Sequence, residues 1–450
     1  MKVIIAGAGV VGTALAKQLS QEGHRVVIID RDRELLHDVA EKLDVLALLG
    51  NAASPKMLRR AGVEDTDLLI AVTNSDEVNV IVAMIGANLG VEDRMVRVRN
   101  REYTIDNPDL LLPALGINHV INPEPVVVDS VMRLLDIPGA EEVTTIAHGQ
   151  VQILRFSIDN DSPVAGKTLA DIRRVGALNA FLILEITRGD KTFVPRGYDT
   201  VEPGDHIYAL VASDTVPFLV PMMHRSVPQT HRVIIAGASR LGIELAKKLQ
   251  RRVKFVIVVE KDPERASVAA EMLEDCNVLQ GDCTDLELLR EAAIESCDLF
   301  CAVSEDDQRN MLAALLAKRH SQARTAVLVH QPEFIPVLDS LGVESVISPR
   351  MVTIGEILTH VRKGMIHSVT QMSHSDAELL ELEVPVGSAM DHTPLKDLKF
   401  PKGALVAAIA NDDIVVIPDG ETIIDAGNRA FIYCRPAAIP GVEKMFATRK

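Results

Sequence analysis

Two short apolar runs stand at equivalent places in the two halves of the chain. Residues 3–6 and 233–236 are apolar and mostly β-branched, and glycines follow each run at once. Such a run bounded by glycine is typical of a buried parallel strand. An apolar stripe with a spacing of four follows each turn, at Val11, Leu15 and Leu19 and at Leu241, Leu245 and Leu249. The pattern predicts a strand, a tight turn and a helix in each half.

Alternating strand and helix patterns continue for some 120 residues after each turn. In the first half the predicted strands are residues 26–29, 45–49, 68–73, 95–99 and 119–121. Short strands separated by turn residues then replace this pattern, at 152–158, 181–187 and 206–211 and at 379–384, 404–410 and 429–433. The alternation predicts an α/β fold: two Rossmann-like, doubly wound parallel-sheet domains alternating with two small α+β domains.

The whole chain is a duplication with a period of about 230 residues. AGVEDTDLLIAVTNSDEVN at residues 61–79 returns as AAIESCDLFCAVSEDDQRN at 292–310. We predict nucleotide-binding domains at 1–123 and 230–349, small domains at 141–226 and 367–450, and linking helices at 124–140 and 350–366. The stripe of Val127, Val131 and Leu134 suits either an arm that packs on another domain or an ordinary last helix.

The first turn carries a nucleotide-binding pattern. Gly7, Gly9 and Gly12 form G-x-G-x-x-G around Ala8, Val10 and Val11. The glycines allow the turn, the approach of a pyrophosphate and close packing of the helix, whose N-terminus favours anions. Asp30 ends the next strand, where a carboxylate accepts hydrogen bonds from ribose and favours NAD over NADP. The alternative is a glycine turn that has lost its ligand.

The second turn repeats this pattern with substitutions. Its residues are Gly237, Ala238, Ser239, Arg240, Leu241 and Gly242, and Glu260 takes the place of Asp30. Ser239 adds a Cβ where a phosphate would approach, and Arg240 adds a cation where the first turn has Val10. We interpret this copy as a site for a phosphorylated nucleotide with more negative charge. The alternative is a copy that only supports the sheet.

Further candidate residues follow the other predicted strands. Ligands of open α/β sheets bind at the carboxyl ends of the strands. We expect adenine and ribose to lie near the residues at those ends, which are Gly50, Asn51, Thr73, Asn74 and Arg99 in the first half and Gly281, Asp282, Ser304, Glu305 and His330 in the second.

Composition excludes several classes of protein. The net charge of −16 argues against nucleic-acid binding, and the absence of an 18-residue apolar stretch argues against membrane insertion. The N-terminus is a predicted strand rather than a secretory signal, so we expect a cytoplasmic protein. Cys276, Cys283, Cys297 and Cys301 cluster without the spacing of a metal site, which favours buried free thiols.

The ordered set of motifs resembles the TrkA family of Trk potassium uptake proteins, with paired RCK (KTN) domains. The resemblance covers essentially the whole chain and rests on GAGVVG from Gly7, Asp30, AVTNSDEVN from Ala71, VRNREY from Val98, LGINHVINPE from Leu115, SPVAGKTL from Ser162 and EPGD from Glu202. It implies a regulatory subunit, peripheral on the cytoplasmic face of the inner membrane, that controls a potassium-translocating membrane subunit. It also implies a homo-oligomer, namely a tetramer.

The resemblance assigns two sets of ligand-binding residues. The NAD(H) site falls on Gly7 to Val11, Asp30, Thr73, Asn74 and Arg99, and the second site on Gly237 to Leu241, Glu260 and Asp282. An arginine at the position of Arg240 reaches nucleotide phosphates in related RCK proteins, which suits ATP or ADP. Ser239 departs from the family's glycine pattern. The sequence offers no metal site and no catalytic set.

Two alternative functions are an NAD-dependent dehydrogenase and a cytosolic redox sensor. A dehydrogenase needs a proton donor beside the nicotinamide, in a pocket with apolar walls. The small domains are short and rich in turns, and His119 and His206 are each isolated near a strand. The regulator is therefore the favoured hypothesis, with no enzymatic activity.

Overall fold

The computed structural model describes residues 1–100, 103, 115–175, 181–189, 191–224, 229–361, 366–411 and 414–447. Arg101 and Glu102 of the VRNREY motif lie outside the described residues. The chain divides into two compact units. The first unit contains Met1–Val126 and Pro349–Leu358, and the second contains Val127–Ser348 and Thr359–Lys450.

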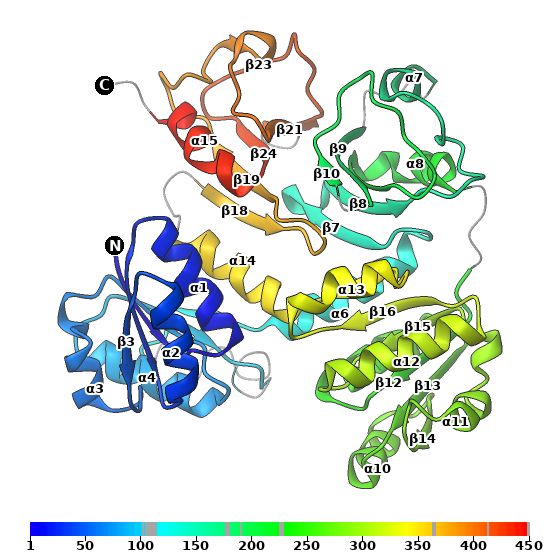
Figure 1. Cartoon of the computed structure of the whole chain (residues 1–450), viewed down its shortest axis with the longest axis horizontal. Helices are drawn as coiled ribbons and strands as arrows, with labels where there is room; N and C mark the ends of the chain where they lie inside the picture. Colours follow the sequence, from blue (N-terminus) through cyan, green and yellow to red (C-terminus); the bar gives the residue numbers. More distant parts are fainter. Residues whose placement is uncertain are drawn as a thin grey trace. The chain divides into compact units, whose positions relative to one another are not determined.

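The first unit is built on a six-stranded parallel sheet with the order β3-β2-β1-β4-β5-β6. Figure 1 shows this sheet in blue with helices packed around it. This is the strand order of dinucleotide-binding folds. The strands are β1 (Lys2–Ala6), β2 (Arg25–Asp30), β3 (Leu46–Leu49), β4 (Leu68–Ala71), β5 (Asp93–Arg97) and β6 (His119–Ile121). The helices are α1 (Val10–Gln21), α2 (Arg33–Lys42), α3 (Pro55–Arg60) and α4 (Asp76–Asn88), with a 3-10 turn at Val63–Asp65.

Two predicted strand ends were wrong by two residues. β4 ends at Ala71 and β5 at Arg97, not at 73 and 99. The amide of Thr73 donates to the Asn79 side chain, and the amide of Arg99 donates to the Asp76 side chain. Side chains of α4 thus replace the sheet as partners of these amides, which the apolar run does not reveal.

The second nucleotide-binding fold repeats the first, with the order β14-β13-β12-β15-β16-β17. The strands are β12 (Arg232–Ala236), β13 (Phe255–Glu260), β14 (Asn277–Gln280), β15 (Leu299–Ala302), β16 (Arg324–Leu328) and β17 (Ser345–Ile347). The helices are α9 (Arg240–Leu249), α10 (Pro263–Met272), α11 (Leu286–Glu291), α12 (Asp307–His320) and α13 (Ile335–Ser340), with 3-10 turns at Ile294–Ser296 and Pro332–Phe334. The predicted fold class is confirmed.

A helix from the first repeat completes this second fold. Ile234 and Ile257 face a cluster with α11, α12 and α13, whereas Val233 and Val258 face α9 and α10. The latter cluster also contains residues of α6 (Pro123–Asp136), among them Val131. The sequence suits either an arm that packs on another domain or an ordinary last helix of the first domain. The shared cluster supports the arm. Pro349–Leu358 of α14 (Pro349–Val361) belongs in turn to the first unit.

The two small domains are antiparallel sheets with the orders β10-β9-β11-β8-β7 and β18-β19-β24-β21-β22. The first contains β7 (Glu142–Ile146), β8 (Val151–Ser157), β9 (Phe181–Arg188), β10 (Lys191–Phe193), β11 (His206–Ala212), α7 (Leu169–Val175), α8 (Val216–Met223) and 3-10 turns at Ala147–Gly149 and Ser213–Thr215. The second contains β18 (Ile366–Gln371), β19 (Glu378–Glu383), β20 (Thr393–Pro394), β21 (Ala404–Asn411), β22 (Ile414–Val416), β23 (Ile423–Ile424), β24 (Arg429–Cys434), α15 (Ile439–Phe446) and 3-10 turns at Leu395–Asp397 and Pro436–Ala438.

The two sheets share one apolar cluster inside the second unit. Ile153, Leu184 and Leu210 from the first small domain lie in this cluster with Leu379 and Phe431 from the second. All five side chains are nearly or fully buried. Burial of this apolar area is the main force that holds the two domains together.

The four clustered cysteines are free thiols, as predicted. Cys283, Cys297 and Cys301 are buried, but Cys276 is only partly buried. Burial raises the pKa of Cys276 and Cys283 to about 11. These thiols are therefore protonated at neutral pH and are poor nucleophiles.

In the described part of the chain, no helix is long and apolar enough to cross a membrane.

Candidate functional site

The first glycine turn is shaped by close packing at two of its three glycines. Gly7 has a φ of 110°, and its amide donates to the carbonyl of Ile29 at 2.9 Å. A Cβ on Gly12 would stand 1.8 Å from the carbonyl oxygen of Gly7. A Cβ on Gly9, in contrast, would meet no atom within 4 Å. The fold therefore requires Gly7 and Gly12, while Gly9 leaves open space at the start of α1.

Asp30 lies against this turn. Its Oδ2 accepts the amide of Ala8 at 2.6 Å, and its Oδ1 accepts the amide of Asp32 at 2.9 Å. Each carboxylate oxygen keeps a further lone pair for another donor. The carboxylate thus fixes the turn and can also accept a hydrogen bond from a ligand hydroxyl.

The other turn residues divide between core and surface. Val11 is buried with the core face of α1, and Val10 is 45% exposed. Asn51 closes a local turn by accepting the amide of Ala53 at 3.1 Å. The amide of Gly50 donates to the carbonyl of Asp30 at 2.7 Å, so the end of β3 lies beside the end of β2.

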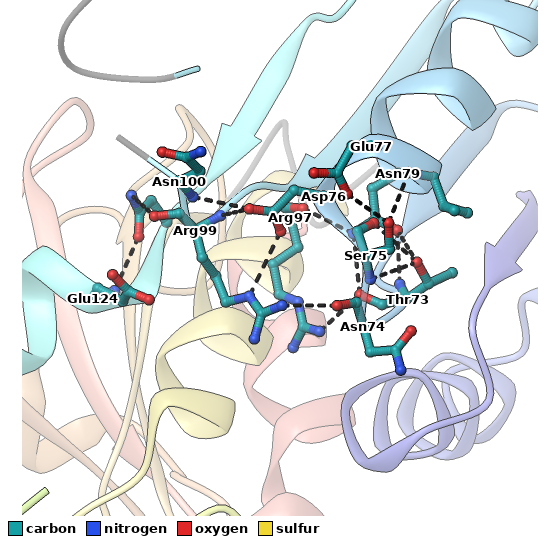
Figure 2. Close-up of polar contacts among 12 residues, drawn as sticks. Thr73, Asn74, Ser75, Asp76, Glu77, Asn79, Arg97, Arg99, Asn100 and Glu124 are labelled. Atoms are coloured by element: carbon teal, nitrogen blue, oxygen red, sulfur yellow. Dashed lines mark hydrogen bonds and ion pairs between the residues drawn. The ribbon is translucent and has the colours of Figure 1, made fainter. Parts of the chain in front are cut away.

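A fully buried side chain of α4 holds the end of β4. Asn79 accepts the amide of Thr73 at 2.8 Å and its hydroxyl at 2.7 Å (Figure 2). Its amide nitrogen donates to the carbonyls of Thr73 and Arg97. Asn79 therefore ties the end of β4 to the end of β5, and it uses both Oδ1 and Nδ2 to do so.

Two guanidinium groups meet at the same edge of the sheet. Arg97 donates to the carbonyl of Thr73 and Arg99 to the carbonyl of Asn74, both at 2.8 Å. Both side chains point toward the Thr73–Asn74 segment (Figure 2). Burial, and then repulsion from Arg99, lower the pKa of Arg97 to about 10. Like charges kept this close favour an anion beside them.

Asp76 is the carboxylate that faces this pair. It is 7% exposed, and its Oδ2 accepts the amides of Arg99 and Asn100, both at 2.9 Å. Its Oδ1 lies 3.6 Å from Nε of Arg99. Asp76 thus places Arg99 and compensates part of the positive charge, but within the described residues Nε of Arg97 has no hydrogen-bond partner.

The second turn has the same backbone and a different cap. Gly237 has a φ of 113°, and a Cβ on Gly242 would stand 2.0 Å from its carbonyl oxygen. Ser239 accepts the amide of Gly242 at 3.3 Å and donates to the carbonyl of Val303 at 3.0 Å. The side chain at this position therefore occupies a donor of the first turn of α9, whereas Gly9 gives α1 no such cap.

Glu260 takes the role of Asp30 in the second fold. Its Oε2 accepts the amide of Ala238 at 2.6 Å, and its Oε1 accepts the amide of Asp262 at 2.9 Å. At 8% exposure it is buried. Leu241 is also buried, in the core cluster that includes α6. Arg240 is the first residue of α9.

The strand ends of the second fold carry their own charge pattern. Asp282 accepts two hydrogen bonds from Thr284 and lies 3.1 Å from Nζ of Lys261. Partial burial acts to raise its pKa, but these contacts lower the pKa of Asp282 to about 2. Asp307 accepts the amides of His330 and Gln331, as Asp76 does with Arg99 and Asn100. Leu328 and His330 stand where the first fold has Arg97 and Arg99.

Three residues at the first site were absent from the prediction: Asp76, Asn79 and Arg97. The first two lie inside the repeated stretch AVTNSDEVN, and their counterparts Asp307 and Asn310 make the same contacts. The repetition of these polar residues in both halves was the available signal. Arg97 has no such signal, because the second copy replaces it with leucine.

Two family models match the chain twice each. The TrkA-N domain matches residues 3–123 and 233–349, and the TrkA-C domain matches residues 153–217 and 379–447.

Proteins named Trk system potassium uptake protein TrkA resemble the chain over its full length. The one from Haemophilus influenzae is 33% identical over 453 residues, which is 99% of this chain and 98% of that protein. A TrkA homolog from Archaeoglobus fulgidus is 33% identical over 447 residues, which is 99% of this chain and 100% of that protein.

Solved structures support the fold. The crystal structure of the GsuK RCK domain has a TM-score of 0.61 at 19% identity and covers 100% of this chain and 95% of that chain. The GsuK channel bound to NAD has a TM-score of 0.59 at 18% identity and covers 100% of this chain and 79% of that one. Both domain models match in both halves, and the relatives are similar to the chain over its full length. The chain therefore belongs to the TrkA family of Trk system potassium uptake proteins.

Proposed function

We propose that this protein is a regulatory subunit of potassium transport that binds NAD(H) at its first glycine turn. The observation that carries the proposal is the first turn itself, where open space above Gly9 adjoins a carboxylate, Asp30, that still has lone pairs for ribose hydroxyls. The two arginines at the strand-end edge, Arg97 and Arg99, add positive charge for a phosphorylated ligand. The GsuK channel has been solved bound to NAD and bound to ADP.

We further propose that the second turn binds ATP or ADP. Arg240 adds a cation at the start of α9, where the first turn has Val10. A guanidinium group pairs well with phosphate oxygens, so an additional phosphate gains more at the second site than at the first. Glu260 and Asp282 lie at the neighbouring strand ends as candidate partners for ribose and base.

The proposed partner is a potassium-translocating membrane subunit of the Trk type, on whose cytoplasmic face a tetramer of this chain would lie. In this proposal the protein is a peripheral subunit that carries out no catalysis. A nucleotide that binds one conformation more tightly shifts the population toward it, and a coupling of about 1–3 kcal/mol changes affinity by 5- to 150-fold. Turnover of NADH with any of a panel of carbonyl substrates would contradict this proposal and support a dehydrogenase.

A crossed pair of substitutions tests the two sites in one experiment. We expect Asp30→Ala to weaken NADH binding by about 1–3 kcal/mol, because a charge-assisted hydrogen bond to ribose is lost. We expect Arg240→Ala to weaken ATP binding about tenfold or more. Isothermal titration of the full chain with each nucleotide measures both affinities.

Each variant serves as the control for the other. Asp30→Ala should keep the ATP affinity, and Arg240→Ala should keep the NADH affinity. Equal loss of both ligands in either variant, or unchanged NADH affinity in folded Asp30→Ala, would refute the assignment of ligands to sites.

A further inference from the structure

Three consecutive polar residues of the second small domain contact two other domains inside the second unit. Ser373, His374 and Ser375 follow β18, and we call them the polar latch. The hydroxyl of Ser373 donates to Glu142 at 3.1 Å, and the hydroxyl of Ser375 donates to Glu185 at 2.7 Å. Glu142 and Glu185 belong to β7 and β9 of the first small domain.

The middle residue of the latch reaches the second nucleotide-binding fold. Nδ1 of His374 lies 2.7 Å from Oδ2 of Asp339, which is on α13. The His374 side chain is 1% exposed. Its backbone amide donates to the hydroxyl of Tyr208 at 3.3 Å, and that hydroxyl donates to Glu142 at 2.5 Å. The latch therefore joins the second small domain to the first small domain and to α13.

A buried arginine connects the same groups from the other side. Nη1 of Arg155 lies 2.8 Å from Oε2 of Glu141, and Nη2 lies 3.5 Å from Oδ2 of Asp339. Arg155 is 2% exposed and Glu141 is 5% exposed. Nδ1 of His206, whose side chain is 30% exposed, lies 3.0 Å from Oε2 of Glu141. Two histidines thus border one group of charges, of which Arg155 and Glu141 are buried.

The charges of this group do not balance while both histidines are neutral. Among the described residues in these contacts, three carboxylates (Glu141, Glu142 and Asp339) face one guanidinium, that of Arg155. Buried charges are costly unless they are paired. Protonation of His374 and His206 would add two positive charges and bring the group to neutrality.

The two carboxylates that contact Arg155, those of Glu141 and Asp339, have lowered pKa values. Burial acts to raise the pKa of Glu141, but Arg155 and His206 hold it below the ordinary value. Burial likewise acts to raise the pKa of Asp339, but His374 and Arg155 outweigh this effect and lower it. Histidine is the side chain type whose charge ordinarily changes between about pH 5 and pH 8, so His374 is the group of this cluster to test.

Other titratable groups also face the latch. Glu185 accepts from Ser375 and from the hydroxyl of Tyr433, and burial raises its pKa. Tyr208 stays protonated, because burial and Glu142 raise its pKa. Asp376, next to the latch, is exposed and paired with Arg435. Beyond His206, Asp159 and Asp161 line a cavity of about 390 Å³ that has His206 in its wall. A test must therefore separate His374 from Glu185.

We propose that the polar latch is a proton-sensitive contact, in which protonation of His374 tightens the hold of the second small domain on the first small domain and on α13. Nε2 of His374 has no hydrogen-bond partner among the described residues. Nε2 lacks a partner both as an acceptor in the neutral ring and as a donor in the charged ring, so the contact of Nδ1 with Asp339 is what differs between the two forms. The latch loosens as pH rises and His374 becomes neutral.

The position of Asp339 gives the latch a route to the second nucleotide site. Asp307 at the strand-end edge holds the amides of His330 and Gln331, and the chain then passes through a 3-10 turn (Pro332–Phe334) into α13. Asp339 lies near the end of that helix. One short segment therefore runs from the edge of the candidate nucleotide site to the latch.

Hydrogen–deuterium exchange of the full chain, corrected for the intrinsic pH dependence of exchange, tests the proposal. The reporters are the amides of Ser373 and His374, whose acceptors are Glu142 and Tyr208 of the first small domain. We expect their protection to be severalfold higher at about pH 6 than at about pH 8, because the charged ring of His374 attracts Asp339 and the neutral ring does not. Equal protection at the two pH values would overturn the proposal.

Three variants identify the group that titrates. His374→Asn should reduce the pH dependence severalfold, with His206 left to supply the remainder, whereas Glu185→Gln should keep it. His367→Asn is the matched control, because His367 on the neighbouring strand β18 is exposed and pairs with exposed Glu383 at 3.3 Å. Loss of the pH dependence in Glu185→Gln but not in His374→Asn would overturn the assignment to His374.

A fourth variant keeps the test valid should His374→Asn unfold the domain. Protection of the amides in β24, at the centre of the second small sheet, reports whether the domain is folded. Asp339→Asn retains His374 and removes the carboxylate that faces it, so the pH dependence should shrink severalfold. An unchanged pH dependence in folded Asp339→Asn would contradict the proposal.

Discussion

At the scale of single residues, the two halves of the chain place their positive charge differently. The first half has Arg97 and Arg99 at the end of β5, and the second has Leu328 and His330 there. The glycine pattern and the spacing to Asp30 were visible in the sequence because they repeat. The role of Arg97 was not visible in the sequence, because a charged residue in an apolar strand pattern gives no indication of which backbone carbonyl its side chain will contact.

Replacing Arg97 with the residue of the second half separates binding from stability. We expect Arg97→Leu to leave the free energy of unfolding within about 1 kcal/mol of the parent or to raise it, because a partly buried charge with an incomplete set of partners is costly. NADH affinity should fall about tenfold, because the ligand phosphates lose a cation.

Thermal unfolding and NADH titration of the same Arg97→Leu sample measure the two effects. ATP binding at the second site is the internal control and should not change. A stable variant with full NADH affinity would show that Arg97 serves the fold alone.

At the scale of elements, the strand ends depend on side chains of the next helix. The apolar runs predicted the strands and their order along the chain, and the duplication predicted that both sheets are alike. They could not predict where β4 and β5 end, because Asn79 and Asp76 of α4 take over the amides of Thr73 and Arg99. Such long-range side-chain contacts are decided by the folded structure and not by local pattern.

Asn79 should therefore be among the most sensitive polar residues of the first fold. We expect Asn79→Ala to lower the free energy of unfolding by about 2–4 kcal/mol, because it removes the fully buried side chain that pairs with the amide of Thr73 and the carbonyl of Arg97. Urea denaturation followed by circular dichroism measures this loss.

Asn88→Ala is the matched control, because Asn88 on the same helix is exposed and, among the described residues, its side chain donates to the carbonyl of Met84 within its own helix. It should cost less than about 0.5 kcal/mol. Similar losses for the two variants would show that the contacts of Asn79 add no stability.

At the scale of the whole molecule, the folding units do not follow the order of the repeats. The sequence predicted two repeats in tandem, and both family models match each repeat once. Yet α6 shares a core cluster with the second parallel sheet, and Pro349–Leu358 of α14 belongs to the first unit. The apolar stripe of α6 indicated that the helix has a partner, but a stripe does not say which sheet that partner is.

The shared packing of the two repeats predicts how the chain responds to being cut. We expect the fragments 1–226 and 227–450 to aggregate when each is produced alone, because the apolar face of α6 loses its partners Leu241 and Leu245. Produced together, the two fragments should form a one-to-one complex, which size-exclusion chromatography with light scattering detects. Monomeric, folded single fragments would contradict this expectation.

The exchanged helices also bear on how a duplicated gene keeps both of its copies. A tandem copy that folds by itself can be lost, or can separate into a gene of its own, without harm to its neighbour. Here the first copy provides α6 to the second sheet, and the second copy provides part of α14 to the first unit. Deletion of either copy removes a helix from the fold of the other. This mutual dependence favours the retention of both copies in a folded protein, and it leaves the two turns able to differ, as they do at Gly9 and Ser239.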